Sequence, residues 1–125
     1  MSQSSASRIK HEQKKSLLFR ALSNLVAELA LEEPTLTKIF LTRVELSSGE
    51  GLCTVYFYSN EGRAAFDQAL AHLKLYKPSL RSALAKVRQA RHTPDLKFAY
   101  DEAFEKERHI HELLDEIQAE GSDEE

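Results

Sequence analysis

The sequence has little of several features that mark common classes of protein. Its single cysteine, Cys53, excludes a disulfide within one chain, and we expect that side chain to be a small buried apolar group. No apolar run approaches the roughly 20 residues of a membrane span. Residues 1–15 are rich in Ser and Lys and lack the apolar segment of a signal peptide. The sequence therefore predicts a cytoplasmic protein with no membrane partner.

Groups that carry catalysis or bind cofactors are also scarce. No Ser or Cys stands in a recognisable nucleophile motif, and no cluster of His, Cys, Asp or Glu has the spacing of a metal site. His109 and His111, two residues apart on a helix, would project about 200° apart and cannot share an ion. The four glycines, at positions 49, 51, 62 and 121, form no phosphate-binding loop. We expect neither an enzyme nor a bound metal or cofactor.

Charge is abundant but unevenly distributed along the 125 residues. The net charge is −3, yet it is +4 over residues 1–20, −4 over 21–73, +6 over 74–97 and −9 over 98–125. A strongly basic segment that holds a single acid favours a partner with a phosphate backbone. With 42% hydrophobic residues, the chain is long enough to form one globular domain without disulfides or metal.

The first half of the chain predicts a helix followed by a strand hairpin. Leucines and a valine recur at helical spacing over residues 8–32, and the residue before Pro34 is pushed out of the helical conformation. β-Branched and aromatic residues predict strands at 36–47 and 52–59. The sequence Ser-Gly-Glu-Gly between them favours an antiparallel turn.

The second half predicts an interrupted helix, a strand and a last helix. Apolar residues continue in one phase from Phe66 to Val87, but Pro78 removes a backbone donor, so we expect two helices or one sharply kinked helix. Alternating apolar residues over 96–100 indicate a third strand. A short acidic amphipathic helix follows, and its apolar residues are Ile110, Leu113, Leu114 and Ile117.

These elements predict an α+β sandwich in which helices cover one face of a strand hairpin. We place a single domain at residues 8–118, including the acidic helix. Residues 1–7 are predicted to be a disordered N-terminal arm, and residues 119–125 an acidic disordered tail.

The cations best suited to contact phosphates concentrate in the interrupted helix. Four of them follow at spacings of three, four and seven, so they share one side of a helix whose other side packs on the core. The predicted RNA-binding residues are Lys74, Lys77, Arg81, Lys86, Arg88, Arg91, His92, Lys10, Lys14 and Lys15. Reversing the charges of Arg81 and Arg88 should weaken RNA binding without unfolding the domain. The alternatives are a solvated helix face and, for the N-terminal lysines with Arg8 and Arg20, a solubilising helix start.

Two tyrosines of the second strand are weaker candidates for RNA contact. Tyr56 and Tyr58 point to one side of the strand and could stack on bases. Packing against the core, or partial exposure on a strand, is the simpler explanation of both.

The run Arg91-His92-Thr93-Pro94-Asp95-Leu96-Lys97-Phe98, followed by Tyr100-Asp101-Glu102, resembles the ribosome-binding factor A family. Further matching segments span residues 8–117, including Val44-Glu45-Leu46-Ser47 and Leu80-Arg81-Ser82. The resemblance implies a KH-like fold of the type II topology, helix-strand-strand-helix-kink-helix-strand, without a GXXG loop. In that family the kink carries Ala-x-Gly, where this chain has Tyr76-Lys77-Pro78.

The resemblance also implies a function and partners. The family's role would make this chain a monomeric assembly factor that binds the free or immature 30S subunit and its 16S rRNA. It would assist late subunit maturation and processing of the rRNA 5′ end, with neighbouring ribosomal proteins as further contacts. Two alternatives remain open at this point. One is a generic RNA-binding or RNA-chaperone domain, and the other is a protein-interaction module that docks a partner through the acidic C-terminal helix.

Overall fold

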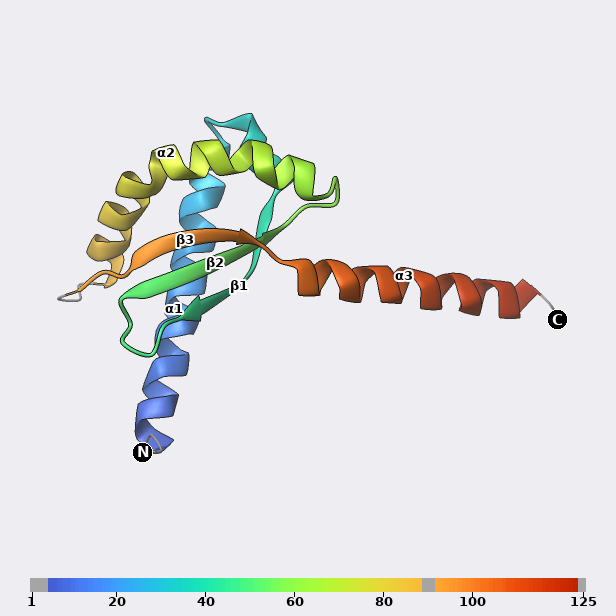
Figure 1. Ribbon diagram of the computed structural model, residues 1–125, viewed down its shortest axis with the longest axis horizontal. Coiled ribbons are helices and arrows are strands. Elements are labelled where there is room, and N and C mark those ends of the chain that lie inside the picture. The colour runs from blue at the N-terminus through green and yellow to red at the C-terminus, as the bar shows by residue number, and fades with distance from the viewer. Residues whose placement is uncertain (1–4, 89–91, 124–125) are drawn as a thin grey trace.

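The computed structural model describes residues 5–88 and 92–123, which form an α+β fold as predicted (Figure 1). Three strands form one sheet, and two long helices pack on one face of it. The elements in chain order are α1 (Ser5–Ala30), the 3-10 helix η1 (Pro34–Lys38), β1 (Phe40–Leu46), β2 (Leu52–Tyr58), α2 (Arg63–Arg88), β3 (Asp95–Tyr100) and α3 (Glu102–Asp123).

The sheet has the strand order β1-β2-β3. β1 and β2 form the predicted antiparallel hairpin, in which Val44 pairs with Val55. β3 runs parallel to β2 on its other side, and Val55 pairs there with Phe98. Parallel neighbours need a long crossover connection, and α2 provides it across one face of the sheet.

The core lies between that face and helices α1 and α2. Cys53, Val55 and Phe57 alternate along β2 and are completely buried, as expected for the central strand of a covered face. From the helices, Leu18 of α1 and Leu73 of α2 are equally inaccessible. The opposite face of the sheet is polar and partly exposed over most of its length. The fold is therefore an open-faced sandwich.

The segment after Pro34 differs from the prediction, which placed a strand at residues 36–47. Residues Pro34–Lys38 form η1, and β1 begins only at Phe40. Proline is favoured in the first turn of a helix because its amide needs no partner there. Leu36, whose residue type suggested a strand, is instead almost fully buried in the core, where η1 packs against helices α1 and α2.

Helix α2 is continuous over 26 residues although Pro78 lies inside it. The ribbon bends along α2, so the helix follows the twisted sheet rather than leaving it (Figure 1). Pro78 has no N–H for the carbonyl of Lys74, and both residues are exposed. Water can hydrate that carbonyl, and the bend keeps Leu73 and Leu80 buried on either side of the proline. The kinked helix, one of the two predicted alternatives, is what the structure contains.

Two helices extend beyond their predicted limits. α1 starts at Ser5, inside the predicted N-terminal arm, and α3 continues to Asp123, inside the predicted tail. The predicted limits followed apolar periodicity, which marks only the part of a helix that has an apolar face. α3 leaves the sheet and projects away from the domain, at the end opposite the β1–β2 turn (Figure 1). No helix among the described residues is long and apolar enough to cross a membrane.

Candidate nucleic-acid interface

The cationic segments meet around the β1–β2 turn, at one end of the sheet (Figure 1). From α1, Lys14 Nζ lies 2.7 Å from the Glu50 carboxylate in that turn. The amide of Asp95, which begins β3, donates to the carbonyl of Gly51 in the same turn at 3.0 Å. The last part of α2 approaches Asp95 through Arg81. We call this region the basic end. Its cations are those of the first half of α1, those of α2 from Lys74 to Lys86, and His92 in the loop before β3.

Lys77 and Arg81 of the basic end are engaged within the protein. Lys77 Nζ lies 3.1 Å from Asp95 Oδ1, and the hydrogen bond from Lys77, followed by that from the Leu96 amide, lowers the pKa of Asp95. The Arg81 guanidinium donates to the carbonyls of Thr93 at 3.2 Å and Pro94 at 3.3 Å. These contacts hold α2 against the start of β3. Because the two cations share one acid, a net positive charge remains at this surface.

The position of Arg81 changes one expectation from the sequence. Reversing its charge would remove two charge-assisted hydrogen bonds, so the domain would not keep its full stability. We expect Arg81→Ala to lower the free energy of unfolding by about 1–2 kcal/mol, because each bond contributes about 1 kcal/mol and the side chain is half-exposed. Lys74→Ala, on the exposed side of the same helix, serves as the control. Urea denaturation of both variants measures the difference, and equal stabilities would mean that the Arg81 contacts contribute nothing.

The lysines of α1 divide into engaged and outward-facing ones. Lys14 pairs with Glu50, and Lys15 lies 3.6 Å from both Glu12 and Glu45. Lys10 is exposed on the same helix. The positive charges of Lys14 and Lys15 are therefore partly neutralised within the protein, whereas that of Lys10 is not paired in the same way with an acid among the described residues.

Three more predicted contacts face solvent. Lys74 and Lys86 are exposed on α2, and His92 is exposed in the loop before β3. Among the described residues, neither Lys74 nor Lys86 has an ion pair. Arg88 is the last residue of α2, and its side chain is outside what the structure describes, while Arg91 lies outside the described residues altogether.

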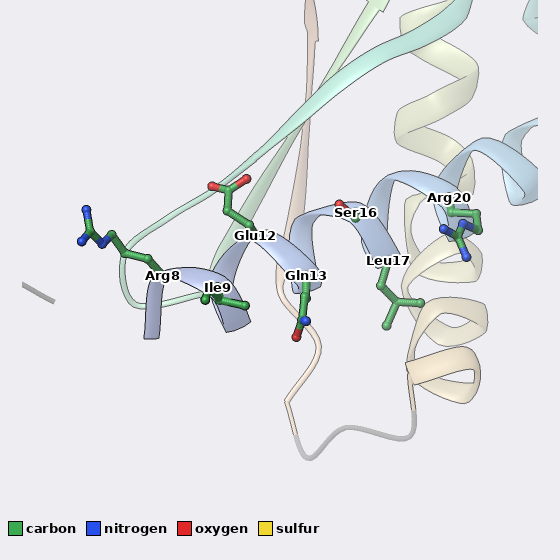
Figure 2. A pocket seen from close by; sticks show the side chains of 7 residues that line it. All are labelled: Arg8, Ile9, Glu12, Gln13, Ser16, Leu17 and Arg20. Atoms are coloured by element: carbon green, nitrogen blue, oxygen red, sulfur yellow. The ribbon is translucent and has the colours of Figure 1, made fainter. Parts of the chain in front are cut away.

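The hollows of the surface are open grooves. One, of about 760 Å³, is lined only by residues of α1, with Arg8 and Arg20 at its ends and Ile9 and Leu17 between them (Figure 2). Another, of about 540 Å³, runs between α1 and β1 and includes Arg43. Open grooves with cations suit an extended polyanion better than a small substrate. The described residues contain no group of three or more His, Cys, Asp or Glu placed to hold a metal ion.

The two tyrosines of β2 have structural partners. The Arg43 guanidinium lies 3.7 Å from the ring centroid of Tyr56. The Tyr58 ring is buried against Phe40 and Phe104, with centroid distances of 5.6 and 4.8 Å. The simpler of the two explanations, packing and partial exposure on a strand, therefore describes their surroundings.

A buried carboxylate, which the sequence indicated only as part of a helix start, fixes the base of α3. Asp101 is 2% exposed, and its Oδ1 accepts the Phe104 amide at 3.0 Å, which caps α3. Its Oδ2 accepts Thr42 Oγ1 at 2.5 Å and Arg43 Nε at 3.1 Å. Burial acts to raise the pKa of Asp101, but the hydrogen bonds from Thr42 and Phe104 and the charge of Arg43 outweigh it and hold that pKa below its usual value.

Of the interactions of Asp101, only its role as the N-terminal cap of α3 could have been predicted from the sequence. An acid just before a helix is a local signal, whereas the approach of Thr42 depends on a β-bulge between Leu41 and Arg43. A bulge re-aims a side chain, and here the re-aimed hydroxyl reaches a residue 59 positions further along the chain.

Comparison with known proteins points to one family. The model of the family described as ribosome-binding factor A matches residues 10–114. Ribosome-binding factor A of Brevibacillus brevis is 35% identical over 124 residues, which are 97% of this chain and 95% of that protein. Its counterpart in Pelobacter propionicus is 33% identical over 110 residues, or 88% of this chain and 83% of that protein.

Solved structures show the same likeness. The crystal structure of ribosome-binding factor A from Thermus thermophilus has a TM-score of 0.62 at 28% identity, covering 72% of this chain and 93% of that one. A homology model of the Thermus thermophilus factor, fitted into the cryo-EM map of a complex of that factor with the 30S subunit, has a TM-score of 0.55 at 30% identity. It covers 67% of this chain and 87% of that one.

Proposed function

The chain belongs to the ribosome-binding factor A family, and on that premise we propose that it binds the free or immature 30S subunit and its 16S rRNA. In this proposal the chain assists late maturation of the subunit, including processing of the 5′ end of that RNA. The observation that carries the proposal is the likeness to a Thermus thermophilus relative that is fitted into a map of its 30S complex. The family is one of ribosome-binding factors rather than of known enzymes.

The charge distribution supports an RNA partner and indicates which part of the chain meets it. Residues 74–97 carry a net charge of +6, and the exposed Lys74 and Lys86 of the basic end are among them. Phosphate contacts of this kind supply affinity but little sequence information. The shape of the rRNA and neighbouring ribosomal proteins would then select the site.

The mechanism that follows is a shift of population rather than a chemical step. A protein that binds one maturation state of the subunit better than another stabilises that state by the difference in binding free energy. A difference of about 1.4 kcal/mol shifts the ratio of the two states about tenfold. The open grooves and the exposed cations are compatible with such a role, because binding needs a surface rather than an enclosed pocket.

Co-sedimentation tests the proposal. We expect the purified chain to pellet with free small subunits in preference to large subunits and whole ribosomes. The bound fraction should fall steeply between low and physiological salt, because binding of Lys and Arg to phosphates is driven by release of the counterions condensed on the RNA. Equal binding to all three particles would reduce the chain to a generic RNA-binding domain. No binding at either salt concentration would refute the proposal.

A further inference from the structure

Helix α3 presents an apolar stripe that the domain leaves uncovered. The side chains of Ile110, Leu113, Leu114 and Ile117 follow at positions i, i+3, i+4 and i+7, and are 45–64% exposed. We call these four residues the α3 stripe. A helix in a globular domain normally buries such a stripe against a neighbour. Several large aliphatic side chains that gather on one exposed helix face are typical of an interaction surface.

The domain itself cannot cover the stripe because α3 is attached by another of its faces. The Phe104 ring packs against Phe40 and Tyr58. One turn later, Arg108 lies over the Tyr58 ring and donates to Asn60 Oδ1 at 3.2 Å. At 100° per residue, the stripe is centred roughly 130° around the helix axis from Phe104. Beyond its first turns α3 extends past the sheet, as Figure 1 shows.

The negative charge of α3 limits the kinds of partner that can bind the α3 stripe. The 22 residues of α3 include eight acids and two cations, a net charge of −6. Two of the acids, Glu107 and Glu120, adjoin the borders of the stripe in helical projection. This surface repels phosphates, and two copies of α3 would repel each other, whereas Lys and Arg beside an apolar face would be attracted.

We propose that the α3 stripe docks a basic amphipathic helix of a partner protein. The stripe spans about two helical turns, or roughly 10 Å, which matches the apolar face of a short helix with anchors at i, i+3, i+4 and i+7. The proposal does not depend on the proposed RNA function. Because α3 and the basic end lie at opposite ends of the domain, both surfaces can be occupied together.

Fluorescence anisotropy with a defined probe tests this inference. The probe is a labelled peptide of Leu and Lys with Leu at helical spacing, and the reference is a peptide of the same composition whose order abolishes the apolar face. We expect the full chain to bind the amphipathic peptide at least about tenfold more tightly than the reference. Equal binding of the two peptides would overturn the proposal, because attraction would then be electrostatic only.

Two variants locate the contact. Leu113→Ser with Ile117→Ser should weaken peptide binding at least about tenfold. The matched control, Leu31→Ser with Leu75→Ser, removes two exposed leucines elsewhere and should bind as the parent does. Unchanged binding in the stripe variant would refute the proposal. If that variant loses helix content by circular dichroism, Glu107→Gln with Glu120→Gln keeps the stripe and should still weaken binding severalfold; parental binding there would count against it.

Sedimentation equilibrium tests whether a second copy of this chain, rather than a partner protein, covers the α3 stripe. We expect the chain to stay monomeric, and a concentration-dependent dimer that the stripe variant abolishes would make a second copy the occupant instead. The stripe variant should pellet with small subunits as the parent does. Failure of the RNA proposal and failure of this inference are therefore read out separately.

Discussion

Replacing Lys74 and Lys86 with Glu is expected to weaken binding to small subunits by about 10- to 100-fold without changing the thermal midpoint of unfolding. Both side chains are exposed on α2 and have no ion pair among the described residues, so reversing their charge breaks no ion pair there. Each reversal removes a cation from the basic end and adds an anion that repels phosphate. The slope of log affinity against log salt concentration should also become shallower by about two.

A matched variant separates local contact from net charge. Lys38→Glu with Lys106→Glu produces the same change in net charge, but at η1 and α3, away from the basic end. We expect that variant to retain most of the parental affinity. If both variants lose affinity equally, the effect arises from overall charge, and the assignment of the basic end is wrong. Filter binding to purified small subunits at several salt concentrations measures both quantities.

Asp101→Ala is expected to lower the free energy of unfolding by about 3 kcal/mol, and the thermal midpoint by about 10 °C. The change removes the carboxylate that accepts from Thr42, Arg43 and the Phe104 amide, and only the first two have another acceptor among the described residues, the Tyr56 carbonyl and Glu45. Arg43 is half-buried and keeps part of its hydration, which places the cost at the low end for a broken buried pair. Glu102→Ala, an exposed acid at the next position, is the control and should melt close to the parent. Differential scanning calorimetry compares the three proteins, and a midpoint for Asp101→Ala equal to that of the control would refute this account of the cluster.

Acid should reduce the difference between the parent and Asp101→Ala. The pKa of Asp101 is depressed in the folded protein, so its contribution is complete above the unfolded Asp value of about 3.9 and is lost as the pH falls through the folded value. We therefore expect the gap in unfolding free energy to narrow between about pH 5 and pH 2. Urea titrations across that range measure it. A gap that stays constant would mean that the ionised carboxylate is not what stabilises the cluster.

Local sequence patterns predicted the sheet and the core well, because both depend on periodicity. The alternation of Cys53, Val55 and Phe57 is visible in the sequence and is what the buried face of β2 requires. The pattern failed at Leu36, where Pro34 initiates a helical turn and tertiary packing buries the leucine without a strand. β-Propensity reflects half-buried surroundings as much as backbone preference. From the sequence alone, a leucine buried in η1 therefore cannot be distinguished from a leucine buried in a strand.

The candidate site was less predictable than the fold, because the sequence shows where the cations are but not which acids and carbonyls they contact. Lys77 and Arg81 share the helical side of Lys74, as expected, but Asp95 is the only acid in the basic segment and lies where both reach it. The Thr93 and Pro94 carbonyls that accept from Arg81 are 12 and 13 positions away, which no helical spacing indicates. The stripe on α3 was visible in the sequence, but its exposure was not, since amphipathic periodicity does not say what covers the apolar face.

The order of the strands has a consequence for synthesis of the chain. β2 is central in the sheet, yet its partner β3 follows it only after the whole of α2. On a nascent chain, β1 and β2 can pair early, while one edge of β2 stays open until residues 95–100 emerge. An open strand edge is the usual starting point of wrong pairings between chains. The α2 helix lies between the two strands in sequence and can cover the apolar face of the hairpin during that interval. This leaves less apolar surface of the incomplete sheet exposed to other chains.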